Sequence, residues 1–297
     1  MSLDKQKVKS FIDGISNLPT IPKTGMRIIQ LAMNPEVSME RLGAAIQQDP
    51  SLASRVLKVA NSPYYGASRR VDSLPLALII LGLREIQHII LGITFFNAMK
   101  NLHSKNTHYR ESFWLHSAAC GVVARILSKK LGFRSEGADF AAGLLHDLGK
   151  IAIDACFDGK FVATFNKTFS DKTPMIVAER EILGDTHEKI GGMLARKWQL
   201  PKTLCDAIEC HHEFPSMRSF ASLKDPRIVA ISYLSEAFCQ HYEIGWDGDS
   251  GDSELDNTRA WEVLLRGHNV YNPRDIDIII TETLQVFKEV SPHLLWE

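Results

Sequence analysis

The segment AAGLLHDLGK, residues 141–150, places the ionisable pair His146-Asp147 inside a run of apolar side chains. A buried carboxylate costs free energy unless it is paired, hydrogen-bonded or bound to a metal. The pair therefore needs partners from elsewhere in the chain. Further histidines stand among apolar residues or at predicted helix ends, where side chains can converge: His116, His187, His211 and His212.

The composition is that of an ordinary globular protein. The 297 residues are 45% hydrophobic, enough for one large domain or two ordinary ones. The net charge of −1, without an extended basic run, argues against nucleic acid as a partner. Five scattered cysteines without C-x-x-C spacing and a polar N-terminus indicate a cytoplasmic protein with reduced thiols. The longest apolar run, residues 74–96, is interrupted by charges, so no membrane span is expected.

The spacing of apolar residues predicts an all-α fold, because no alternating run is long enough to predict a strand. Ser38 and the pair Asp49-Pro50 are helix start signals, and Gly82 separates two apolar helices. Asp185 and Glu188 indicate a capping box. The predicted helices cover residues 23–33, 38–47, 50–60, 73–81, 84–99, 109–131, 136–153, 161–170, 173–183, 185–198, 201–211, 226–241, 258–265 and 273–289.

The candidate metal ligands are His116, His146, Asp147, His187, His211 and His212. Neutral imidazole and carboxylate together suit a divalent transition metal such as Fe, Mn, Zn or Ni. Several histidines with one Asp could form a mononuclear or a dinuclear site. Such a site lowers the pKa of bound water and polarises a phosphoryl oxygen. Lys150, one turn beyond Asp147, could then neutralise charge on a phosphate.

A simpler interpretation stands beside each of these residues. A single buried histidine such as His116 or His187 is usually a hydrogen-bonded core residue. Asp185 is expected to act only as a helix cap, and Cys210 as a small buried hydrophobe. The other histidines lie in polar or terminal stretches and are not expected to be ligands: His103, His108, His241, His268 and His293. The joint pattern, rather than any single residue, favours a metal site.

The order of these residues resembles a known superfamily. The spacing His116, His146-Asp147-x-x-Lys150, His187, His211-His212-Glu213 resembles the HD superfamily of metal-dependent phosphohydrolases, particularly the ligand order of HD-GYP cyclic-dinucleotide phosphodiesterases. The first half carries Leu18-Pro19-x-x-Pro22, Ile46-x-x-Asp49-Pro50-x-Leu52-x-x-x-Val56-Leu57, Ala60-Asn61-Ser62 and Leu81-Gly82. This combination resembles the HDOD domain, the HD-related output domain of bacterial signalling proteins, over residues 15–237.

The resemblance implies an all-α fold in which an N-terminal helical bundle packs on an HD-type helical bundle. The expected parts are an N-terminal helical subdomain at residues 1–105, an HD-like helical subdomain at 106–242, and a loop with C-terminal helices packed on the HD-like part at 243–297. It further implies a bacterial, cytoplasmic protein of signal transduction. Many HDOD domains have lost metal ligands and have no established catalytic activity.

The chain departs from both patterns. No Gly-Tyr-Pro follows His212-Glu213, and the late Asp that completes an HD site is missing. Tyr233 stands at that place, with Glu236 one turn later. A phenol with a pKa of about 10 is a poor substitute for a carboxylate. Glu236 could reach the site only if its helix is shifted.

Two hypotheses follow for function. The first is a non-catalytic regulatory module that binds a regulatory protein, with a nucleotide second messenger as a further candidate ligand. Its candidate surfaces are residues 18–22 and the loop 61–70, each of which could equally be a structural turn. The alternative is a metal-dependent phosphohydrolase acting on a nucleotide or cyclic dinucleotide, with Asp147 and Lys150 as its catalytic residues.

Overall fold

The structure is a computed structural model that describes residues 30–31, 34, 36–61, 70–100, 107–133, 135, 137–156, 159–212, 220–246, 248–249, 254–266 and 273–291. Helices are the only regular elements among these residues, which confirms the all-α fold class. The chain divides into a large unit, residues 1–18 and 102–284, and a small unit, residues 19–101 and 285–297. Most of the helix predicted at 23–33 lies outside the described residues.

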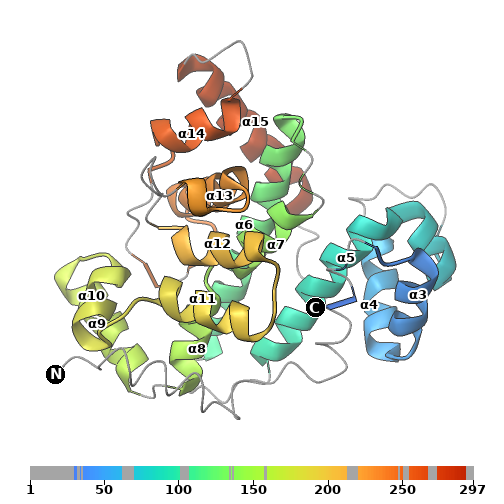
Figure 1. Cartoon of the computed structure of the whole chain (residues 1–297), viewed down its shortest axis with the longest axis horizontal. Helices are drawn as coiled ribbons and strands as arrows, with labels where there is room; N and C mark the ends of the chain where they lie inside the picture. The colour runs from blue at the N-terminus through green and yellow to red at the C-terminus, as the bar shows by residue number, and fades with distance from the viewer. Residues whose placement is uncertain are drawn as a thin grey trace. The chain divides into compact units, whose positions relative to one another are not determined.

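The small unit contains three described helices that begin at local sequence signals. They are α3 (Met39–Gln47), α4 (Pro50–Ala60) and α5 (Leu74–Lys100) (Figure 1). The Ser38 side chain accepts a hydrogen bond from the Arg41 N–H at 3.2 Å, and Asp49 Oδ1 accepts one from the Leu52 N–H at 3.0 Å. Both predicted caps are therefore confirmed, because each satisfies a backbone donor that the first helical turn leaves open.

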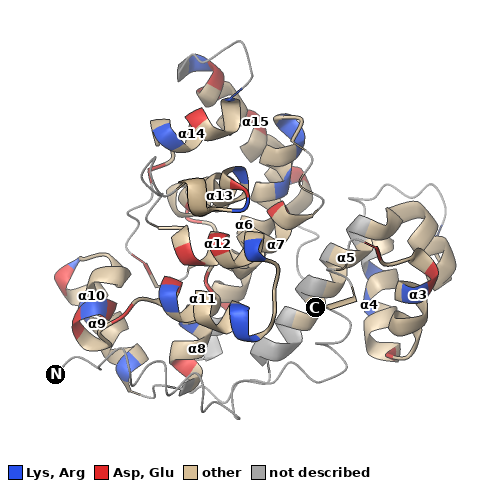
Figure 2. Ribbon diagram, in the orientation of Figure 1, with Lys and Arg blue, Asp and Glu red and all other residues tan. Residues whose placement is uncertain are grey.

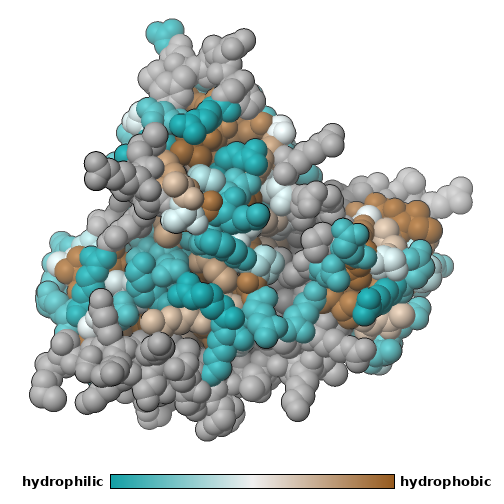
Figure 3. Space-filling view, in the orientation of Figure 1, coloured by the Kyte–Doolittle hydropathy of each residue, from teal (hydrophilic) through white to brown (hydrophobic). Residues whose placement is uncertain are grey.

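The core of the small unit is aliphatic. Leu42, Ile46 and Val56 are fully buried in it. Within α5, Gly82 has a φ of 77°, a conformation that glycine adopts without strain, and it confirms the break predicted between two apolar helices. Ahead of this break Ile79 is 76% exposed, and Figure 3 shows apolar surface over this part of the unit.

The side chain of Asn61 joins the end of α4 to the start of the next segment. Its Nδ2 donates to the carbonyls of Leu57 at 2.8 Å and Val71 at 2.7 Å, and its Oδ1 accepts from the Val71 N–H at 2.8 Å. Asn61 therefore closes the loop that was considered as a docking surface. Residues 62–69 of that loop, and the segment 18–22, lie outside the described part of the chain.

The large unit is a bundle in which α6 packs on α7 and α13, and α11 packs on α8 and α12. Its helices are α6 (Thr107–Lys130), α7 (Ala138–Leu145), α8 (Leu148–Cys156), α9 (Lys160–Asp171), α10 (Met175–Ile182), α11 (His187–Lys197), α12 (Lys202–Cys210), α13 (Pro226–His241), α14 (Thr258–Leu265) and most of α15 (Pro273–Val290). A short 3₁₀ turn covers Phe220–Ser222. Basic and acidic residues are mixed along the visible helices of this unit (Figure 2).

Two glycines of the opening motif allow neighbouring helices to approach closely. A Cβ on Gly143 would lie 2.4 Å from the Cys120 carbonyl oxygen of α6. A Cβ on Gly149 would lie 1.8 Å from the His187 carbonyl oxygen of α11. Any larger residue would therefore push α7 from α6, or α8 from α11. The motif needs both glycines to bring His146-Asp147 against these helices.

The structure corrects the continuous helix predicted at residues 136–153. The helix is interrupted at His146-Asp147, between α7 and α8. His146 Nδ1 lies 2.7 Å from the Gly143 carbonyl, and the Lys150 N–H donates to the Asp147 carbonyl, three residues back. These local hydrogen bonds replace the regular helical pattern.

The predicted capping box at Asp185 and Glu188 is also wrong. Thr186 occupies the N-cap position of α11, while Asp185 Oδ1 accepts from the adjacent Thr186 N–H at 3.0 Å. Glu188 Oε1 instead accepts from the His212 N–H at 3.2 Å. The Glu188 carboxylate therefore binds a backbone group of a neighbouring helix end, and not the start of its own helix as the local sequence predicted. Separately, no helix within the described ranges is long and apolar enough to cross a membrane.

Candidate metal centre

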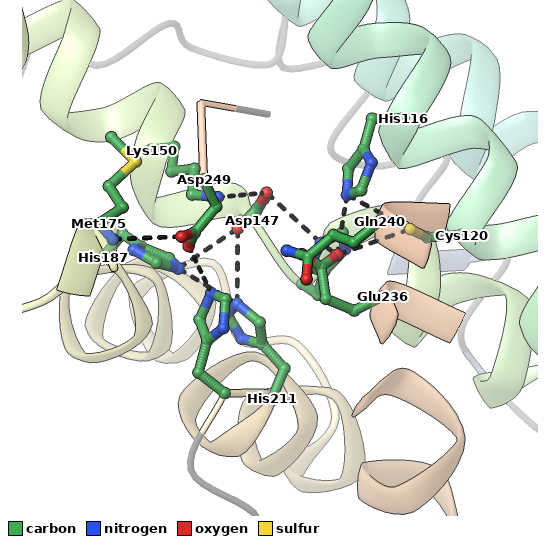
Figure 4. Close-up of polar contacts among 12 residues, drawn as sticks. His116, Cys120, Asp147, Lys150, Met175, His187, His211, Glu236, Gln240 and Asp249 are labelled. Carbon is green, nitrogen blue, oxygen red and sulfur yellow. Dashed lines mark hydrogen bonds and ion pairs between the residues drawn. The ribbon is translucent and has the colours of Figure 1, made fainter. Parts of the chain in front are cut away.

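The structure brings together the residues that the sequence singled out. His116 comes from α6, His146 and Asp147 from the turn between α7 and α8, His187 from the start of α11, and His211 and His212 from the end of α12 (Figure 4). All of these residues except His212 are 0–1% exposed. The His212 side chain is 5% exposed.

Asp147 lies at the middle of the cluster. Its Oδ2 is 3.0 Å from Lys150 Nζ and 3.4 Å from His146 Nε2. Its Oδ1 is 3.3 Å from His187 Nε2 and 3.4 Å from His211 Nε2. The two carboxylate oxygens therefore face different histidines, and Asp147 connects two halves of the cluster.

Glu236, rather than Tyr233, reaches the place of the missing Asp. Glu236 Oε2 lies 2.8 Å from His116 Nε2 and 2.7 Å from His146 Nε2. The Tyr233 hydroxyl instead accepts hydrogen bonds from the Glu254 N–H at 3.0 Å and from Asn257 Nδ2 at 3.2 Å. The helix carrying both residues has the bounds that the sequence predicted, so the longer reach of the Glu side chain is sufficient.

The histidine rings are oriented by hydrogen bonds on their far sides. His146 Nδ1 faces the Gly143 carbonyl at 2.7 Å, and His211 Nδ1 faces the Ile208 carbonyl at 2.9 Å. A carbonyl oxygen only accepts, so Nδ1 carries a hydrogen in each ring, and in the neutral ring Nε2 presents a lone pair. His187 Nδ1 lies 2.8 Å from Glu179 Oε2, which also accepts from the His187 N–H. Metal-ligating histidines are oriented in this way.

Acceptor atoms therefore face one another across the cluster. His187 Nε2 and His211 Nε2 lie 3.2 Å apart, and both face Asp147 Oδ1. The side-chain atoms His146 Nε2, Asp147 Oδ1 and His212 Nε2 have no hydrogen-bond partner of good geometry among the described residues. Lone pairs and carboxylates held at these distances require a proton or a cation between them.

The donors form two groups, and within each the candidate ligand atoms lie within 4.8 Å of one another. The first group is His116, Cys120, His146 and Glu236; the second is Asp147, His187, His211 and His212. Imidazole nitrogens with carboxylate oxygens, and one thiol, fit a divalent transition metal. The sequence analysis missed Cys120, although its position one helical turn after His116 on α6 was a readable signal.

Burial and charge set the protonation of the cluster. Burial lowers the pKa of His187 to about 3, with Lys150 adding to the effect, so the ring is neutral and able to bind a metal at neutral pH. Burial opposes ionisation of Asp147, but the charges of Lys150 and His146 outweigh it and hold the pKa of this carboxyl well below its usual value. Burial raises the pKa of Glu179 to about 8, although the hydrogen bond from the His187 N–H stabilises the charged carboxylate and opposes this rise.

The protonation of His146 follows from its neighbours. Burial disfavours the charged ring, but Asp147 and Glu236 outweigh this and hold the pKa of His146 well above its usual value. In the metal-free protein a proton on His146 can therefore balance part of the negative charge. A divalent cation would take the place of this proton, since metal binding requires neutral imidazole.

A segment after α13 covers the cluster from outside. The Ile244 carbonyl lies 3.3 Å from His116 Nδ1, and a Cβ on Gly245 would meet the His116 backbone N at 2.4 Å. Asp249 Oδ1 accepts from the Met175 N–H at 3.2 Å, and its Oδ2 lies 3.6 Å from His212 Nε2. The sequence predicted a loop here but gave no reason to connect Asp249 with the cluster.

A buried set of histidines around a His-Asp pair, in an all-α bundle, defines the HD class of protein. The profile of the HDOD domain matches residues 18–214, which is more than half of the sequence. The chain therefore belongs to the HDOD domain family.

Comparisons with known proteins agree with this assignment. An HDOD domain protein of unknown function from Geobacter sulfurreducens has a crystal structure with a TM-score of 0.83, at 26% identity, covering 98% of this chain and 97% of that one. An "Uncharacterized protein" of Treponema pallidum (strain Nichols) is 28% identical over 207 residues, or 69% of this chain and 40% of that one. A ribonuclease Y of Aquifex aeolicus (strain VF5) is 30% identical over 112 residues, 38% of this chain and 15% of the enzyme. The chain thus spans less than half the length of these two curated relatives.

Proposed function

We propose that the chain is a cytoplasmic, metal-holding regulatory module of the HDOD family. One observation carries the proposal: the Nε2 atoms of the oriented histidines and the oxygens of two carboxylates converge in a buried cluster, where His146 Nε2, Asp147 Oδ1 and His212 Nε2 have no hydrogen-bond partner of good geometry among the described residues. The closest oppositely charged approach, between His146 Nε2 and Glu236 Oε2, is 2.7 Å. Such a cluster is costly to bury unless a cation completes it.

The donor sets suggest room for one or two ions. His116, His146 and Glu236 would hold one, and His187, His211 and His212 the other, with Asp147 between them because its two oxygens face different groups. Glu179 and the Gly143 carbonyl would keep the imidazoles oriented from behind. A divalent ion at such donors polarises phosphoryl oxygens and acidifies water.

Three features support a regulatory role over turnover. The family is the HDOD domain family. A protein from Marinobacter aquaeolei, provisionally assigned to signal transduction, shares the fold at 21% identity with a TM-score of 0.72. The donors are 0–1% exposed, apart from His212, so the described residues leave a substrate little direct access to them. A metal held in this closed form would stabilise the surfaces that bind a regulatory protein or a nucleotide second messenger.

The test is thermal unfolding of chelator-treated protein before and after addition of Mn, Fe, Ni or Zn. A ligand that binds only the folded state raises the unfolding temperature. We expect the full rise in wild-type protein and in the control His241→Ala, whose histidine is exposed, and a smaller rise in His146→Ala, which removes a donor of the first group. If none of the four metals changes the unfolding temperature, the proposal is wrong.

A second candidate, a metal-dependent phosphohydrolase acting on a nucleotide or cyclic dinucleotide, is favoured by Glu236. This residue supplies the carboxylate that the sequence seemed to lack, at 2.8 Å from His116 Nε2. In that case Asp147 would hold the ion. Lys150 Nζ, which lies 3.0 Å from Asp147 Oδ2, would turn to a phosphate oxygen. Turnover of such substrates with added Mn or Fe, abolished by Asp147→Ala, would replace the regulatory proposal with this one.

A further inference from the structure

We propose that Cys120 is the fourth donor of the first group, so that this half of the centre binds its ion through a thiolate. The inference rests on the proposed metal centre and adds a chemical class of metal to it. The donor set becomes two imidazole nitrogens, one carboxylate oxygen and one sulfur.

The position of Cys120 carries the proposal. Its Sγ lies 3.5 Å from His116 Nε2 and 3.7 Å from Glu236 Oε2, the two atoms to which a shared ion would bind. Cys120 follows His116 by four residues on α6, so both side chains project from the same face of the helix. The side chain is completely buried.

A second observation points to a ligand at the same place. His146 Nε2, fully buried and aimed into this group, has no hydrogen-bond partner of good geometry within the described residues. Its ring is held from the other side by the Gly143 carbonyl. The other hydrogen-bond contacts of the thiol are the Ser235 carbonyl, at 3.7 Å, and the side chain of Cys239, and a thiol is a weak donor. An ion shared by Cys120 and His146 would satisfy both side chains.

The two halves of the centre then differ in chemistry. A thiolate with imidazoles favours Zn, Co or Fe over Mg and Mn, because sulfur is a soft ligand. The second group offers three imidazoles and a carboxylate, without sulfur. We therefore expect the first group to select a softer ion than the second.

Cobalt provides the test, because a thiolate bound to Co²⁺ gives a charge-transfer absorption band that imidazole and carboxylate ligands do not give. The full chain is loaded with Co²⁺ as wild type, as Cys120→Ser, and as the control Cys205→Ser, whose cysteine is also buried but belongs to neither donor group. Cobalt content is measured on each sample. In parallel, X-ray absorption of the Zn-loaded wild type measures ligand distances, where sulfur lies at about 2.3 Å and nitrogen or oxygen at about 2.0–2.2 Å.

The expected result is a charge-transfer band in the wild type and in Cys205→Ser, its loss in Cys120→Ser with cobalt still bound, and a sulfur shell in the Zn protein. Bound cobalt without the band, or a band that survives Cys120→Ser, overturns the thiolate donor and leaves the metal centre in place. Failure of the wild type to bind any cobalt or zinc removes the centre itself. If Cys120→Ser does not fold, the sulfur shell of the wild type decides alone.

Discussion

The cores of the two units differ in kind. In the small unit the described buried side chains are hydrophobic except Thr94, and Leu42 and Ile46 are completely buried. The large unit buries a network of ionisable groups, in which Asp147, Lys150 and Glu236 are 0–1% exposed. Burial of apolar surface stabilises a fold, whereas burial of charge costs free energy that only partners or a cation offset. The small unit is therefore built for stability, and the large unit carries a cost that a bound metal would explain.

The largest expected effect is that of Asp147→Ala in metal-free protein. The substitution leaves Lys150 and His146 without the carboxylate at 3.0 and 3.4 Å, and breaking a buried pair in this way costs about 3–5 kcal/mol. Denaturant unfolding followed by tryptophan fluorescence, to which the buried Trp261 contributes, measures the loss. The control is Asp171→Ala, which removes an exposed Asp paired with Lys167 and should change little. Equal losses of stability in Asp147→Ala and Asp171→Ala would contradict the claim that the buried charges depend on their partners more than exposed ones do.

Leu42→Ala tests the opposite half of the comparison. Removing this fully buried side chain leaves a cavity in an aliphatic core and should destabilise the small unit by about 3 kcal/mol. Hydrogen exchange measured by mass spectrometry should show faster exchange in α3 and α4. Metal content of the large unit should not change. A parallel loss of metal would show that the two cores do not have separate roles.

Gly149→Ala tests whether close packing of α8 on α11 positions the donors. The added Cβ would lie 1.8 Å from the His187 carbonyl oxygen, so the helices must separate, at a cost of about 2–3 kcal/mol. His187 then moves from Asp147, and we expect weaker metal binding in a calorimetric titration. The control Gly192→Ala, also on α11, meets Glu209 Cβ at 3.2 Å, a contact that a shift of a few tenths of an ångström relieves, and should bind metal normally. Normal binding by both variants would mean that this contact is not required.

The smallest effect is expected for Glu179, which contacts the centre through His187. Glu179→Ala removes the acceptor at 2.8 Å from His187 Nδ1 and should weaken metal binding by about 10- to 100-fold. In Glu179→Gln the amide oxygen can still accept from the ring, so affinity should be nearly retained. The same titration measures both, and a Gln variant as weak as the Ala variant would assign a different role to this carboxylate.

Features that depend on a few adjacent residues could be predicted from the sequence. Ser38 and Asp49 start their helices because their side chains accept hydrogen bonds from backbone N–H groups three residues away, and Gly82 breaks a helix through its own φ. The set of histidines could be named from its spacing. Contacts made across the fold could not: Glu188 was assigned to a cap but binds the His212 N–H, and the interruption at His146 depends on the packing that Gly143 and Gly149 allow.

The remaining site residues show the same limit. Glu236 was one of two candidates for a single position, and the choice depended on the direction in which each side chain leaves α13: Glu236 faces the histidines and Tyr233 faces Glu254. Glu179 and Asp249 lie 8 and 37 residues from the histidines that they face, and no local pattern connects them. Candidate ligands could be named by residue type and order, whereas the groups that orient or cover them required the structure.

The central claim is that the buried polar core of the large unit holds a metal, and metal content tests it most directly. The full chain, purified without chelators, is analysed by plasma mass spectrometry beside His146→Ala and His211→Ala, one variant for each donor group. We expect at least one transition-metal ion per chain in the wild type and a reduced content in both variants. A wild-type protein without bound transition metal, which also takes up none on dialysis against Mn, Fe, Ni or Zn, would contradict the account.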